Sequence, residues 1–241
     1  MEARLLLAAL AALCVPTAAW HAGSLPPRPH RAASPRAAPP AAAEEELTLP
    51  ELQEELLELL DDIPSRGAGA SAEDADDVME IVGELAALNP RPDWAVAPEL
   101  AGRWRLRYTS SKAFHNNRGL TGYARDIGGV STPELLMEIR TDYSIVTYVE
   151  PLTLEGGSIA AVLGGFAGAK EVKAECVWKA SRDVFLVNTQ RIVVGDRSWE
   201  PADRQDKAIR TMGACEPIFL DQNLFVLRSQ IPTIIFVFQR A

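Results

Sequence analysis

The sequence predicts a mainly β protein, an antiparallel barrel of about eight strands preceded by two short amphipathic helices. Three observations lead to this fold class. Apolar residues recur with a period near 3.6 before Pro98 and with a period near 2 after it. The second part holds eight runs of strand-forming residues that are separated by turn signals rather than by helix-length segments. The chain of 241 residues is 47% hydrophobic, which suffices for one sizeable core but not for two full domains.

Two helices are expected between residues 44 and 90, where they would form an N-terminal helical hairpin. The first begins at Thr48, which forms a capping-box pattern with Glu51. Its apolar face consists of Leu49, Leu52, Leu56, Leu59 and Ile63. The second begins at Ser71, has Asp74 three residues later, and ends before Pro90. Its apolar face consists of Val78, Ile81, Val82, Leu85 and Leu88.

The first expected strand has the sequence "GRWRLRYTS". Successive side chains of a strand point to opposite faces, so Trp104, Leu106 and Tyr108 should face the interior together. The alternating residues are Arg103, Arg105 and Arg107. We expect these arginines to face solvent, where they can meet the carboxylates of an acidic protein.

The other expected strands continue to the end of the chain. They cover residues 135–141, 143–151, 170–180, 183–194, 217–220, 223–229 and 233–240. In the run from 170 to 180, Val172, Ala174, Cys176 and Trp178 should point inward. Closing eight strands into a barrel over residues 91–241 removes exposed edges. The interior of such a barrel either fills with side chains or holds one small ligand.

The N-terminus is typical of targeting segments. Residues 1–19 match a signal peptide, with Arg4, an apolar run from Leu5 to Val15, and small residues up to Ala19. Residues 20–43 contain arginine, serine, alanine and proline but no acidic residue, which is transit-peptide composition. This tandem arrangement resembles the bipartite leaders of algae with secondary plastids. The alternative is a secreted protein with a disordered Pro/Ala linker.

Charge and composition exclude several functions. The net charge of the whole chain is −9. The first 40 residues hold four arginines and one glutamate and so contribute +3, which leaves −12 on the remaining residues. This acidity argues against nucleic-acid binding, which needs clustered lysine and arginine. No apolar run reaches the ~20 residues of a transmembrane helix.

Enzymatic and metal chemistry find no support in the sequence. Without the leader, His115 is the only histidine, so a His-rich metal site cannot form in one chain. No set of nucleophile, base and orienting group can be assembled. We therefore expect no catalytic residue, no metal and no cofactor. The sequence leaves open whether Cys176 and Cys215 form a disulfide.

Three blocks of residues carry a family resemblance over about residues 47–241. They are the Leu-x-x-Leu-Asn-Pro helix end at 85–90, the block Leu-x-Gly-x-Trp-x-Leu-x-Tyr-Thr-Ser at 100–110, and Leu-Asp-x-x-Leu with a following arginine at 220–228. Together they resemble the plastid lipid-associated proteins, also called plastid fibrillins. The middle of the chain, "LLMEIRTDYSIVTYVEP", matches that family poorly.

The resemblance implies a lipocalin-like barrel. Gly102-Arg103-Trp104 is similar to the lipocalin Gly-x-Trp signature of the first strand, and in lipocalins an arginine of the last strand lies across that tryptophan. Arg240 has the corresponding position here, and Arg228 is the second candidate. Gly102, Trp104 and one of these arginines would then close the barrel.

The resemblance also implies a function. Family members are non-enzymatic proteins of plastoglobules, thylakoids or pigment bodies, linked to carotenoids, prenylquinones and fatty acids. We expect a hydrophobic plastid metabolite in the barrel, in contact with Trp104, Leu106, Tyr108, Trp178 and Phe236. A core filled by side chains is the competing interpretation. The other hypotheses are a scaffold protein that coats lipid bodies or recruits an enzyme through its N-terminal helices, and, with little support, a lipid-modifying enzyme.

Overall fold

The computed structural model describes residues 47–89, 93–142, 144–154, 156, 169–201, 206–230 and 233–241. The two expected leader segments, 1–19 and 20–43, lie outside the described residues.

The two expected helices are present. Helix α1 spans Leu49–Asp62 and α2 spans Ala72–Ala87, with the 3₁₀ turn η1, Pro64–Gly67, between them. The Glu51 carboxylate accepts hydrogen bonds from the Thr48 amide (2.8 Å) and hydroxyl (2.6 Å). The second capping box is reciprocal: the Ser71 amide donates to Asp74 at 2.7 Å, and the Asp74 amide donates to the Ser71 hydroxyl at 3.0 Å. Two further 3₁₀ turns, η2 (Trp94–Val96) and η3 (Pro98–Leu100), lead into the barrel.

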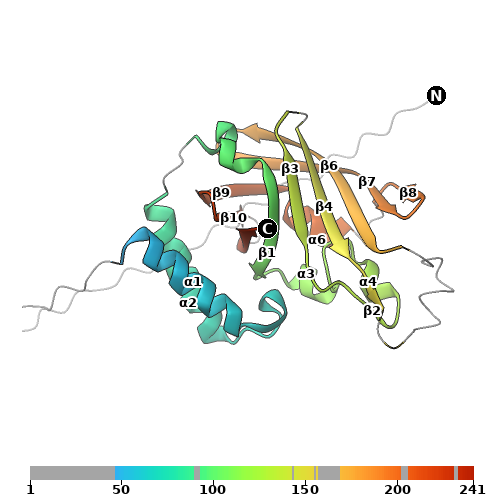
Figure 1. Cartoon of the computed structure of the whole chain (residues 1–241), viewed down its shortest axis with the longest axis horizontal. Coiled ribbons are helices and arrows are strands. Elements are labelled where there is room, and N and C mark those ends of the chain that lie inside the picture. Colours follow the sequence, from blue (N-terminus) through green and yellow to red (C-terminus); the bar gives the residue numbers. More distant parts are fainter. Residues whose placement is uncertain are drawn as a thin grey trace, which may run out of the picture. The chain divides into compact units, whose positions relative to one another are not determined.

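Eight strands form the barrel, which Figure 1 shows as a ribbon. Their bounds are β1 Gly102–Thr109, β3 Leu136–Arg140, β4 Ile145–Pro151, β6 Glu171–Ser181, β7 Val184–Val194, β9 Ala214–Leu220, β10 Leu224–Gln230 and β11 Thr233–Arg240. All pairings are antiparallel and run in the order β6-β4-β3-β1-β11-β10-β9-β7, and the β6–β7 pairing closes the ring. The predicted fold class is confirmed, and each expected strand is present within a few residues of its predicted bounds.

The shorter elements were not predicted. They are the strands β2 (Val130–Ser131), β5 (Thr153–Leu154) and β8 (Arg197–Trp199), and the helices α3 (Lys112–Asn116), α4 (Tyr123–Asp126) and α6 (Asp206–Thr211). Strand β8 pairs with β7 but is not one of the eight barrel strands, and β2 pairs with β5. None of the described helices is long and apolar enough to cross a membrane.

A β-bulge in β1 changes the direction of its last side chains. Opposite β11, Leu106 is paired with Phe238 and Tyr108 with Val237, so Arg107 is the extra residue. As a result Trp104 and Leu106 face the interior, whereas Tyr108 belongs to a second cluster on the outside of the barrel. The expectation that Tyr108 points into the barrel is therefore wrong.

This second cluster joins the helical hairpin to the barrel wall. The buried helix residues are Leu52, Leu56, Leu60, Ile63, Val78, Ile81, Val82 and Leu85, and they pack on outward side chains of β1, β9, β10 and β11. Leu49 and Leu59 are only partly buried at the edge of this cluster, and Leu88 lies beyond the end of α2 and is 47% exposed, so these three are less buried than expected. The apolar faces of both helices are occupied by the protein's own barrel.

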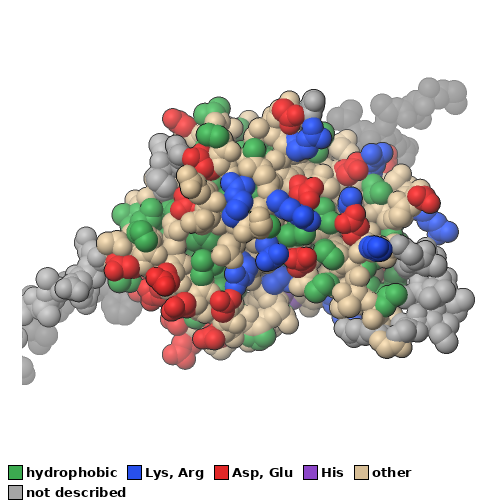
Figure 2. All heavy atoms as spheres, in the orientation of Figure 1, with side chains coloured by type: hydrophobic (Ala, Val, Ile, Leu, Met, Phe, Trp, Pro, Cys, Tyr) green, Lys and Arg blue, Asp and Glu red, His purple; other side chains and the backbone are tan. Residues whose placement is uncertain are grey.

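The arginines of β1 lie on the outer face, as predicted. Arg103 pairs with Glu138 at 3.2 Å, Arg105 with Glu134 at 3.0 Å, and Arg107 with Asp61 of α1. Figure 2 shows basic and acidic side chains intermixed on this face, whereas carboxylates dominate over the helices. Surface ion pairs of this kind contribute about 0–1 kcal/mol each, so their main effect is to keep this side of the barrel polar.

Candidate functional site

One end of the barrel is closed by an arginine stacked on a tryptophan. The guanidinium carbon of Arg240 lies 3.8 Å from the centre of the Trp104 ring. The same guanidinium donates hydrogen bonds to the carbonyl oxygens of Ala101 (3.0 Å), Glu99 (2.5 Å) and Gln222 (3.2 Å). The indole Nε1 of Trp104 donates to the Leu100 carbonyl at 3.1 Å.

Gly102 is required by the closeness of this packing. Its φ is +130°, and a Cβ added here would collide with Nη1 of Arg240. In the structure, Arg240 thus lies against both Trp104 and Gly102. Arg228, the second candidate, lies on β10 and points outward, where it pairs with Glu216 at 2.7 Å. The expectation that Arg228 lies across Trp104 is wrong.

Aromatic rings fill the interior next to this closed end. Trp104 contacts Phe225 with ring centres 5.6 Å apart, Phe225 contacts Phe185 at 6.2 Å, and Phe185 contacts both Trp178 (5.3 Å) and Trp94 (5.9 Å). Offset and edge-to-face contacts at these distances are favourable beyond the apolar area that they bury. The part of the interior next to the closed end is therefore a packed aromatic core.

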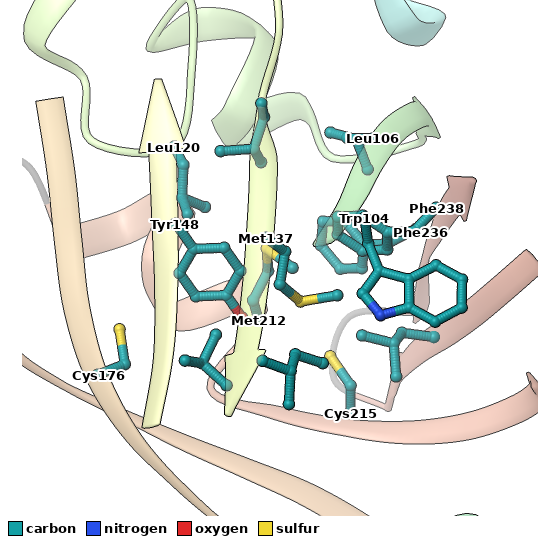
Figure 3. Packing of buried hydrophobic residues seen from close by; sticks show 14 of the residues in the cluster. Trp104, Leu106, Leu120, Met137, Tyr148, Cys176, Met212, Cys215, Phe236 and Phe238 are labelled. Carbon is teal, nitrogen blue, oxygen red and sulfur yellow. The ribbon is translucent and has the colours of Figure 1, made fainter. Parts of the chain in front are cut away.

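Beside this aromatic core, Tyr148 lies among methionine and cysteine side chains (Figure 3). Tyr148 of β4 is opposite Met137 on one neighbouring strand and Ala174 on the other, and Met212 packs in the same core. The Tyr148 hydroxyl is buried and has no hydrogen-bond partner among the described residues. Burial also raises its pKa well above the usual range, so the hydroxyl stays protonated and can donate.

Two cysteines lie near this tyrosine and are both free. The Cys176 thiol is within 3.5 Å of the Thr189 hydroxyl, and the Cys215 thiol is 3.6 Å from the Thr211 carbonyl oxygen. Burial raises the pKa of Cys176 to about 11 and that of Cys215 to about 12. The open question of a disulfide is answered, because neither cysteine is paired with the other.

Helix α3 lies at the other end of the barrel and contacts α6. Strand β1 runs from Gly102 at the closed end to Thr109, and α3 follows it directly. Phe114 of α3, Ile209 of α6 and Met212 after α6 are buried in the same core as Trp104. Access to the interior from this end requires these side chains to move.

The structure brings four of the five expected ligand-contacting residues into one interior. Trp104, Leu106, Trp178 and Phe236 all belong to the barrel core, and Tyr108 does not. Sequence reasoning missed Tyr148, although the alternation of Val146 and Tyr148 in "SIVTYVEP" was a usable signal. Among the described residues, no group of three or more His, Cys, Asp or Glu side chains is arranged to hold a metal ion.

The fold and the interior define a lipocalin-like protein, a closed up-and-down barrel with a largely apolar interior and an arginine–tryptophan contact at one end. The PAP_fibrillin family model matches residues 50–127, which include the helical hairpin, β1 and α3. This match supports the assignment to the plastid lipid-associated, or fibrillin, family. The family implies a plastid, lipid-associated protein. A comparison with curated proteins finds no match.

Proposed function

We propose that this protein binds a hydrophobic plastid metabolite inside its barrel and acts at a lipid surface without catalysis. The single observation that carries the proposal is the Tyr148 hydroxyl. It is a fully buried donor without a described partner in an interior lined mainly by apolar side chains. A buried polar group usually has a partner, so each exception needs an explanation. A ligand with an apolar body and one oxygen acceptor would provide it.

The chemistry of the lumen fits such ligands. Carotenoids, prenylquinones and acyl lipids combine long apolar chains with a few oxygen atoms. Transfer of apolar surface out of water contributes about 25 cal/mol per Å², so a polyene or isoprenoid chain needs no charged contact. Met137 and Met212 have three rotatable bonds each and can repack around an inserted chain. Trp104, Leu106, Trp178 and Phe236 would form the walls.

The second candidate function is a scaffold that coats plastid lipid bodies or recruits a lipid-metabolic enzyme. The observation that favours it is the aromatic core of Trp94, Trp104, Trp178, Phe185 and Phe225, which fills the closed half of the barrel with side chains. In that case the barrel serves as a rigid support, and the exposed acidic faces of α1 and α2 would meet the partner.

Ligand capture separates the two candidates. The full chain is incubated with a total plastid lipid and pigment extract, repurified, and analysed by absorption and mass spectrometry. A carotenoid, quinone or acyl lipid bound at a stoichiometric level supports the carrier. Tyr148→Phe should then change the ligand profile toward molecules without an oxygen acceptor. Tyr108→Phe, the same substitution outside the barrel, should leave the profile unchanged. A well-folded protein that returns empty overturns the carrier and favours the scaffold.

We also propose that the leader directs this protein to plastoglobules or thylakoids of a secondary plastid. The support is the order of the two segments, 1–19 and 20–43. Residues 1–43 fused to a fluorescent protein should enter the plastid of an alga with secondary plastids. Deletion of residues 20–43 should leave the fusion in the secretory pathway. Secretion of both fusions would contradict the proposal.

A further inference from the structure

A separate cavity of about 570 Å³ opens beside α3. Three segments line it: the η1 turn, α3 with the turn that follows, and residues 129–133 before β3. Strand β1 pairs with β3 so that Gly102 faces Ile139 and Arg105 faces Leu136. The cavity therefore lies at the end of the barrel opposite to Gly102 and Trp104. Its volume is in the range of about 300–1,000 Å³ found for small-molecule sites.

The lining of this cavity is cationic, although the protein has a net charge of −9. Arg66 and Arg118 supply the positive charge, His115 lies beside them, and none of the described aspartates or glutamates lines the cavity. The His115 Nε2 is 2.9 Å from the Thr109 carbonyl oxygen. Because a carbonyl can only accept, Nε2 carries the proton, and Nδ1 is the nitrogen that can gain one. A concave site lined by one sign of charge concentrates ions of the other sign.

Arg66 is held in place but not neutralised by contact. Its guanidinium lies over the Phe114 ring, 5.2 Å from the ring centre, and Nη2 donates to the Thr132 carbonyl at 2.8 Å. Its Nη1 is buried and has no hydrogen-bond partner among the described residues. The guanidinium therefore has a buried N–H donor without an acceptor, and burying such a donor costs free energy.

Two carboxylates are close enough to act on Arg66 electrostatically, Glu134 and Glu150, and both are engaged elsewhere. Glu134 pairs with Arg105 at 3.0 Å. Glu150 is fully buried, and its oxygens accept hydrogen bonds from the Leu120 amide and from the amide and hydroxyl of Thr121. Neither carboxylate belongs to the cavity lining.

Arg118 supplies a second guanidinium at the rim. It is exposed, and its side chain has no ion-pair or hydrogen-bond partner in the part of the chain that the structure describes. Gly119 follows it, and a Cβ added there would collide with Oε1 of Glu150. The close contact of Gly119 with the barrel fixes the backbone that presents Arg118.

Backbone strain gathers around this cavity. Five non-glycine residues are described with positive φ, and three of them, Ser65 (52°), Arg66 (58°) and Arg118 (54°), line it. Left-handed backbone costs a non-glycine residue about 1–3 kcal/mol and is concentrated at binding sites. Both arginines are followed by glycine, so two Arg-Gly pairs from distant parts of the chain present their side chains to one space.

We infer that this cavity is an oxyanion site, in which Arg66 and Arg118 hold a carboxylate or phosphate group and Phe114, Val130 and Pro133 contact its apolar part. The group can arrive on a lipid or as a free small anion. The site lies outside the barrel interior, and Phe114 borders both.

Calorimetric titration of the full chain tests this assignment. The probes are sodium dodecanoate, dodecanol and inorganic phosphate. Arg118→Gln removes the exposed guanidinium, and Arg182→Gln is the matched control, because Arg182 is an exposed arginine with φ 57° in the β6–β7 turn. Arg118→Gln should weaken dodecanoate binding about ten- to hundredfold, the effect of losing one charged hydrogen bond. Arg182→Gln should leave it unchanged.

The probes distinguish the two sources of the anion. Phosphate binding with the same dependence on Arg118 means that the site takes free anions. Dodecanoate binding without phosphate binding means that the charge must arrive on an apolar chain. Dodecanol should bind all three proteins alike. The assignment is overturned if no anion binds to the unmodified chain, or if Arg118→Gln binds dodecanoate and phosphate as tightly as Arg182→Gln does.

Discussion

Arg240, the penultimate residue, stacks on Trp104, the third residue of β1, at 3.8 Å, and so joins the last barrel strand in the chain to the first. Arg240→Met would remove the cation–π contact and three hydrogen bonds to carbonyl oxygens, and we expect it to lower the free energy of unfolding by about 2–4 kcal/mol. Arg228→Met, on the neighbouring strand, removes only a half-exposed ion pair and should cost about 0–1 kcal/mol. Urea titrations measure both, and equal losses would contradict the role given to Arg240.

Gly102 and Gly83 should respond in opposite ways to the same substitution. Gly102→Ala places a Cβ against Arg240 on a backbone with φ +130°, which should cost about 2–3 kcal/mol. Gly83 lies inside α2 with nothing within 4 Å of an added Cβ. Gly83→Ala should therefore stabilise the protein by about 0.5–1 kcal/mol. When Arg240 is replaced by methionine, Gly102→Ala should cost less. Thermal unfolding of Gly102→Ala, Gly83→Ala, Arg240→Met and the Gly102→Ala/Arg240→Met double variant measures this, and an unchanged cost of Gly102→Ala in the double variant would contradict the contact between Gly102 and Arg240.

The unpartnered hydroxyl of Tyr148 should make the empty barrel less stable than it could be. Tyr148→Phe removes the hydroxyl without changing the ring, and in ligand-free protein we expect a gain of about 1 kcal/mol in unfolding free energy. Tyr108→Phe, in the outer cluster, should change stability by less than about 0.5 kcal/mol. A loss of stability in ligand-free Tyr148→Phe would show that the hydroxyl already has a partner, such as a buried water.

His115 should make stability depend on pH. Burial lowers its pKa in the folded protein, and the nearby charge of Arg66 acts in the same direction. The unfolded chain therefore binds the proton more readily, and the contribution of His115 to stability, present above its ordinary pKa of about 6.5, is lost as the pH falls. As the pH falls from 7.5 to 5.5, the unfolding free energy of the unmodified chain should therefore decrease relative to that of His115→Gln. A constant or opposite trend in denaturant titrations would rule this out.

Both core cysteines should be unreactive in the native protein. Their pKa values, about 11 and about 12, leave very little thiolate at pH 8, and both side chains are buried. Iodoacetamide should leave the peptides that contain Cys176 and Cys215 unmodified in buffer and alkylate both in urea, as mass spectrometry would record. Rapid modification in buffer would indicate that the barrel opens readily.

Much of this fold can be predicted from periodicity, because a strand that faces a lumen on one side must alternate. The run from Val172 to Trp178 shows this directly, and so do the arginines of β1. The β1 bulge could not be predicted, since one extra residue at Arg107 leaves no mark on composition yet reverses the direction of Tyr108. The helix faces were predicted well except at their ends, where Leu88 follows the last helical residue.

The two candidate sites differ in how far the sequence reveals them. The Gly-x-Trp signature and the terminal arginine identify the closed end. The oxyanion site depends on residues 66 and 118, which are far apart in the chain and resemble ordinary surface arginines. Glu150 also looks like a surface residue, and only the folded barrel shows it to be buried. Tertiary contacts bring Arg66 and Arg118 together and bury Glu150, and the local sequence pattern indicates neither.

The helical hairpin gives the barrel wall two mechanically different halves. In β10 and β11, consecutive residues from Leu224 to Leu227 and from Ile234 to Phe238 are buried, because the lumen lies on one side and the helices on the other. In β6 the outward side chains alternate with the buried ones and face water. A close-packed layer resists displacement, whereas solvated side chains move freely. Displacement of the wall should therefore be easiest at β6, and the strands behind the hairpin form its fixed side.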